Sequence, residues 1–72
     1  MYYELVDLET ANVIRTFTSE DEALASVLRM IDAGGAADMD TIALGRGEDD
    51  GEGEELARGQ ELVTRALAVA RA

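Results

Sequence analysis

The 72-residue chain contains no cysteine, no histidine and no lysine. Without cysteine and histidine it has neither a disulfide nor the usual ligands of zinc. Without an imidazole base, a thiolate or a lysine amine, most of the nucleophile–base pairs used by enzymes are excluded. Carboxylates, hydroxyls and six arginine side chains remain for chemistry. The sequence therefore predicts no catalytic residues, no metal ligands and no cofactor site, and we expect a protein that is not an enzyme.

Positive charge is also scarce, because 16 acidic residues face six arginines and give a net charge of −10. A field of that sign repels phosphate, so we expect no nucleic-acid partner. No apolar run approaches the ~20 residues of a membrane-spanning helix, and the N-terminus lacks the basic and apolar regions of a secretory signal. We therefore expect no membrane partner and a cytoplasmic location. Arginine as the sole basic residue is typical of GC-rich bacterial or archaeal genomes.

Two short apolar runs at the N-terminus predict a β-hairpin. Residues 2–8 and 13–17 are rich in aromatic and β-branched side chains, and the polar residues 9–12 between them form a turn signal. Asn12 suits the end of that turn because asparagine adopts left-handed backbone angles at little cost.

The clearest helical signal follows the hairpin. Ser19 and Glu22 have the spacing of a capping box, in which the serine side chain accepts a hydrogen bond from the amide of the third helical residue. Apolar residues then recur with helical spacing, and a glycine pair ends the pattern. The members of this apolar face are Leu24, Val27, Leu28 and Ile31, and the glycines are Gly34 and Gly35.

The second half of the chain repeats this plan less clearly. One alternative is a single helix from residue 54 to residue 72 with Gly59 in its interior, at a cost of ~1 kcal/mol relative to alanine. We favour a short strand that ends at Gly59 and precedes a helix. The sequence then predicts a single α+β domain, a small two-layer ββαββα fold with two helices on one face of an antiparallel sheet. Its segments are the hairpin 2–17, the helix 20–33, the strand 39–45, the acidic loop 46–54, the short strand 55–58 and the helix 60–71.

The acidic loop raises the question of a cation site. Glu48, Asp50, Glu52 and Gly53 match positions 1, 3, 5 and 6 of an EF-hand loop. The series then fails, because position 12 falls on Gly59, where a bidentate glutamate is required. We favour a solvated loop over a metal site, and a divalent-cation-binding protein that uses residues 48–55 remains the alternative function.

The hairpin offers a candidate interface. Strand side chains alternate between faces, so Tyr3 and Leu5 share one face of the first strand, and Val13 and Phe17 share one face of the second. The opposite faces are also apolar, whereas a sheet with one solvated face alternates apolar and polar residues. We therefore expect a non-enzymatic protein–protein interaction or regulatory module that self-associates as a homodimer or binds another protein. The candidate interface residues are Tyr2, Val6, Leu8 and Ile14.

Overall fold

The computed structural model describes residues 1–49, 51 and 53–70. The expected ββαββα order and α+β class are confirmed, with one additional 3-10 helix, η1, between the two halves. The elements are β1 (Tyr2–Asp7), β2 (Asn12–Phe17), α1 (Glu20–Gly34), η1 (Ala36–Thr41), β3 (Ile42–Gly47), β4 (Gly53–Arg58) and α2 (Gly59–Ala70).

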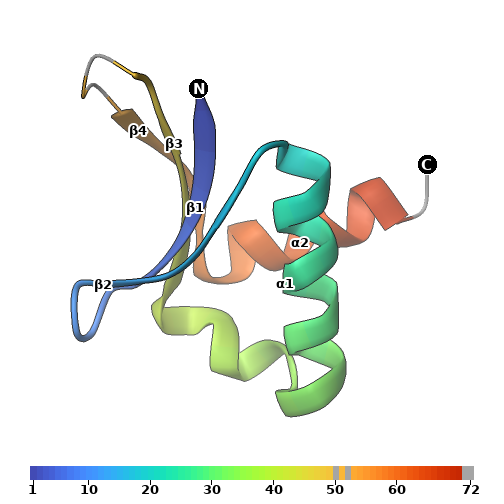
Figure 1. Cartoon of the computed structure of the whole chain (residues 1–72). Coiled ribbons are helices and arrows are strands. Elements are labelled where there is room, and N and C mark those ends of the chain that lie inside the picture. Colours follow the sequence, from blue (N-terminus) through green and yellow to red (C-terminus); the bar gives the residue numbers. More distant parts are fainter. Residues whose placement is uncertain (50, 52, 71–72) are drawn as a thin grey trace.

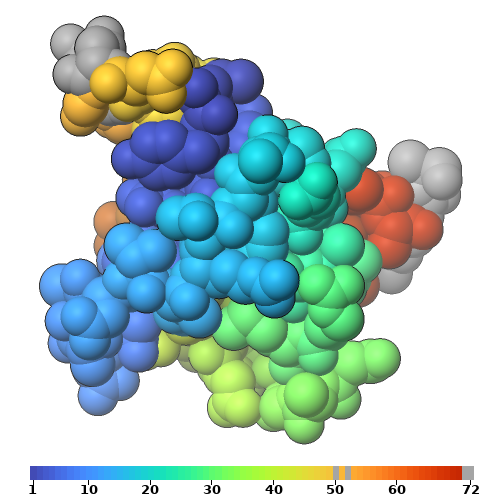
Figure 2. All heavy atoms as spheres, viewed as in Figure 1, coloured from blue at the N-terminus to red at the C-terminus, as the bar shows by residue number. Residues whose placement is uncertain are grey.

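The four strands form one antiparallel sheet in the order β2-β1-β3-β4. Both helices lie on the same side of this sheet (Figure 1), with α1 packed on β1 and β2 and α2 packed on β3 and β4. The β1–β2 turn and the β3–β4 hairpin project at two separate corners of the molecule (Figure 2). The hydrophobic core lies between the sheet and the helices, and its largest fully buried side chains are Leu5, Leu24, Val27, Met39, Leu44 and Leu62.

Helix α1 begins as the sequence predicts. The Ser19 side chain accepts a hydrogen bond from the Glu22 amide at 3.2 Å, and the Glu22 carboxylate accepts one from the Thr18 hydroxyl at 3.3 Å. The helix ends at Gly34, one residue later than predicted. Gly35 has a φ of 93° and donates its N–H to the Ile31 carbonyl, so a glycine in the left-handed region closes the last turn.

The predicted strand over 39–45 is wrong in its first three residues. Residues 36–41 form η1, and β3 begins only at Ile42 and continues to Gly47. The 3-10 turn places Met39 in the core, where its side chain is only 1% exposed. Gln60 of α2 holds the turn, because its side-chain amide donates to the Ala36 carbonyl and the Asp40 carboxylate. A buried apolar residue at position 39 is compatible with a helical turn and with a strand, so the apolar pattern alone does not distinguish the two conformations.

The second half of the chain ends in a strand followed by a helix, which decides between the two alternatives that the sequence left open. Residues 53–58 form β4, which pairs with β3, so a single helix over 54–72 is wrong. Gly59 has a φ of 57° and is the first residue of α2, so the chain turns directly from strand to helix. The strand starts two residues earlier than predicted, and α2 covers residues 59–70 instead of 60–71, with residue 71 outside the described part.

The two hairpins are related by an approximate two-fold axis that passes through the sheet between β1 and β3. Leu5 lies opposite Leu44 in the central antiparallel pair. In the first hairpin the register shifts immediately after Leu5, so Ile14 is an extra residue of β2 with no opposite residue on β1. In the second hairpin the register shifts immediately after Leu44, so Leu56 is the extra residue of β4. Each hairpin therefore carries a β-bulge at the same place and is followed by a helix that covers it.

Candidate interaction surface

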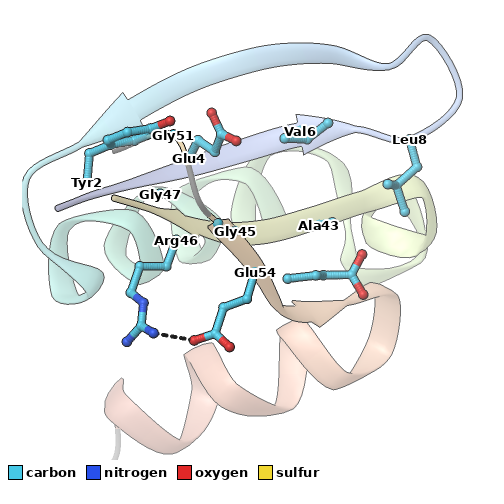
Figure 3. A pocket seen from close by; sticks show the side chains of 12 residues that line it. Tyr2, Glu4, Val6, Leu8, Ala43, Gly45, Arg46, Gly47, Gly51 and Glu54 are labelled. Atoms are coloured by element: carbon cyan, nitrogen blue, oxygen red, sulfur yellow. Dashed lines mark ion pairs between the residues drawn. The ribbon is translucent and has the colours of Figure 1, made fainter. Parts of the chain in front are cut away.

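The face of the sheet opposite the helices has no covering element among the described residues. Tyr2, Glu4, Val6 and Leu8 of β1 and its extension point to this face (Figure 3). Tyr2 and Leu8 are each 39% exposed, and Val6 is half-buried. Three of the four residues predicted as interface thus belong to β1 and its extension on the open face, and the fourth, Ile14, belongs to the neighbouring strand β2.

The bulge in β2 adds two apolar side chains next to Val6. Val13 pairs with Val6 across the strands, and Ile14 is the additional residue beside it. Val13 is 52% exposed and Ile14 is 48% exposed. The expectation that Val13 shares the helix-facing side with Phe17 is wrong, because the bulge breaks the strict alternation of side chains along β2. We call Val6, Leu8, Val13 and Ile14 the apolar ridge.

Beside the ridge the open face is hollow. A shallow groove of about 350 Å³ runs along β3, where the open-face positions are Ala43, Gly45 and Gly47. We call these three residues the glycine trough. The approximate two-fold axis relates Gly45 to Val6, since each residue follows the central leucine of its strand. The groove therefore exists because β3 carries glycine where β1 carries valine.

Tyr2 fills one end of this trough. A Cβ atom placed on Gly47 would clash with Cζ and the hydroxyl oxygen of Tyr2, so the ring lies directly across the glycine. At Gly45 the same test gives only ordinary contacts, the nearest being 3.5 Å to the Glu54 carbonyl oxygen. The Glu4 side chain lies close to this position, with its Cγ atom at 3.7 Å, so a Cβ atom fits at Gly45 beside a side chain that is already there.

Two of the described acids that line the groove form ion pairs with arginine. Arg58 Nε donates to the Glu55 carboxylate at 2.9 Å, and this hydrogen bond raises the pKa of Arg58 above its ordinary value. Arg46 forms an ion pair with Glu54, drawn as a dashed line in Figure 3. Within the described residues Glu4 has neither an ion pair nor a hydrogen bond to its carboxylate. Among the described acids that line the groove, Glu54 and Glu55 are therefore paired with arginine and Glu4 is not.

The proposed cation loop is only partly described, because Asp50 and Glu52 lie outside the described residues. Asp49 is 3.4 Å from the N-terminal amine, and Glu48 is 3.8 Å from the Arg46 guanidinium. Across residues 1–49, 51 and 53–70, no group of three acidic side chains is placed to hold a metal ion. In the same residues no helix has the length and apolar character needed to cross a membrane.

Comparison of the chain with protein-family models, with curated proteins and with solved structures finds no match. The surface must therefore be interpreted from its own geometry. Sequence reasoning missed the ridge residue Val13 and the trough. The alternation Gly45-Arg46-Gly47 within a strand was the available signal for the trough, because glycine inside a strand often marks a close approach of another chain segment.

Proposed function

We propose that this protein is a small, non-enzymatic protein–protein interaction or regulatory module that self-associates through the open face of its sheet. The observation that carries the proposal is the apolar ridge. Three of its side chains, Leu8, Val13 and Ile14, are 39–52% exposed and lie on a face that the helices do not cover. Contiguous exposed apolar patches of this kind mark interaction sites in small soluble domains.

The chemistry of the chain supports an interaction role over catalysis. Cysteine, histidine and lysine are absent from the whole sequence, and the groove presents glycine, apolar side chains and ion-paired acids. The negative field of the chain disfavours a nucleic-acid partner. A 72-residue domain also has a small core, so the folding free energy of the monomer is small. Burial of a second apolar surface in a dimer would add to that stability. We also propose that this module acts in the cytoplasm.

Sedimentation equilibrium at tens of micromolar tests the proposal. We expect a reversible monomer–dimer equilibrium for the wild-type chain. The Val6→Glu variant introduces a charge in the middle of the ridge, and we expect it to weaken dimerisation by about tenfold or more, because the contact would then bury an unpaired carboxylate.

The matched control is Val69→Glu, which makes the same chemical change at an exposed valine of α2, away from the sheet face. This variant should dimerise like the wild type at equal ionic strength, and thermal melts should show that both variants fold. A wild-type chain that remains monomeric throughout the concentration range, with a Val6→Glu variant of equal stability and solubility, would exclude the proposal.

A further inference from the structure

We infer that this chain exchanges its two hairpin–helix units with a second copy of itself, and that the junction at Gly35 is the hinge of the exchange. The first unit comprises residues 1–34, and the second unit begins at residue 35. The exchanged dimer contains two complete folds, each built from the first unit of one copy and the second unit of the other. The exchange uses no contact of the open face and therefore goes beyond the proposed function.

The two units are held together by contacts that a second copy can supply equally well. β1 pairs with β3 along its whole length, and the fully buried Leu5 of the first unit lies opposite the fully buried Leu44 of the second. Helix α1 also packs against α2, where the Glu20 carboxylate lies 3.7 Å from the Arg65 guanidinium. None of these contacts requires that the two units belong to the same chain.

The covalent link between the units is the short turn that follows α1 (Figure 1). Gly35 has a φ of 93° and a ψ of 158°, a conformation that is essentially restricted to glycine. The segment after it belongs to the second unit, because the Gln60 side chain of α2 donates to the Ala36 carbonyl and the Asp40 carboxylate. The direction in which the chain leaves α1 is therefore set at Gly35.

The balance between monomer and exchanged dimer depends on concentration and on the hinge, because all other contacts are the same in both. Two units linked in one chain have an effective concentration in the millimolar range, so the wild-type chain should exchange only near millimolar concentration. A residue other than glycine at position 35 strains the monomer. In the exchanged dimer the chain takes another path at this residue, so the strain is relieved at two hinges.

Gly35→Ala tests the hinge, with each protein refolded from urea at a series of concentrations and its dimer fraction measured by sedimentation equilibrium. If each relieved hinge contributes about tenfold, the dissociation constant of the exchanged dimer falls about a hundredfold. The matched control is Gly51→Ala. Gly51 also has a φ of 93°, and a Cβ atom at either glycine meets nothing within 4 Å, but its turn joins two strands of the same unit. Equal dimer fractions for the two variants would overturn the hinge.

Mixtures of defective chains test the exchange itself. Leu5→Asp and Leu44→Asp each place a charge at a fully buried position of a different unit, so each chain alone should be largely unfolded. In the mixture, the intact first unit of one chain can pair with the intact second unit of the other. At about 100 μM of each chain, well above the micromolar dissociation constant expected for two separate units, the mixture should gain helical circular dichroism.

The control mixture combines Leu5→Asp with Leu24→Asp, which places both defects in the first unit and should give no gain. A dimer formed through the open face gives no gain in either mixture, because each subunit keeps its own defect. A gain confined to the Leu5→Asp and Leu44→Asp mixture therefore supports the exchange. No gain in that mixture, or an equal gain in both mixtures, would overturn the exchange and leave the proposed function standing.

Discussion

At the scale of single residues, the start of α1 shows how far local sequence determines local structure. Ser19 caps the helix as its spacing to Glu22 predicts, and three acidic residues occupy the first turn near the positive end of the helix dipole. Such signals are readable because the capping hydrogen bond joins residues three apart and depends on no distant contact. The glycine pair at the helix end is readable for the same reason.

Ser19→Ala should lower the free energy of unfolding by about 0.5–2 kcal/mol, because an amide at the helix start loses its acceptor. The urea midpoint measures this loss. Ser19→Asp is the matched control, since aspartate caps equally well, and it should keep the wild-type midpoint. Equal midpoints for all three proteins would mean that the hydrogen bond between Ser19 and Glu22 contributes nothing to stability.

At the scale of elements, the sequence predicts which segments are strands and helices but not every boundary. The hairpin, both helices and the presence of a fourth strand follow from periodicity and glycine placement. The 3-10 turn before β3 does not, because its conformation is set by Gln60 of α2 and by the burial of Met39 between packed elements. The bulge that redirects Val13 is likewise a property of the strand pair.

The β3–β4 connection allows a prediction about cations. Two acids of this segment already face positive groups, since Asp49 is near the N-terminal amine and Glu48 is near Arg46. A metal ion would have to compete with both contacts and would lack the bidentate glutamate of an EF-hand. We therefore expect millimolar Ca²⁺ to shift the melting temperature no more than an equal ionic strength of NaCl. A saturable micromolar Ca²⁺ isotherm that is lost in Asp50→Ala would contradict this.

At the scale of the whole molecule, the equivalence of the two hairpin–helix units is the main feature that sequence reasoning did not reach. The order ββα occurs twice in the prediction, but the relation between the halves is visible only in the pairing of Leu5 with Leu44 and in the matching bulges. Few identical residues mark the relation, because a strand position specifies a face and a size rather than one amino acid.

Two separate peptides, residues 1–34 and 35–72, should therefore assemble into the native fold. With about 5 kcal/mol of stability and an effective concentration in the millimolar range for the intact chain, the fragments should associate with a dissociation constant near a micromolar. Circular dichroism of the mixture, compared with the sum of the separate peptides, measures this. An additive spectrum at high concentration would refute it, and Leu44→Asp in the second peptide should abolish the gain.

The central position of the β1–β3 pair also has a consequence for the order in which the chain folds. Each hairpin joins neighbouring segments and can form within about 1–10 μs, whereas β1 and β3 come from opposite halves of the chain. The slow event is then the pairing of β1 with β3, and stable structure appears only when the second unit is complete. An N-terminal half that is still bound to the ribosome would therefore stay unfolded until the second half is synthesised. In the split protein the same association step is bimolecular, and its observed rate doubles when the concentration of the partner peptide doubles.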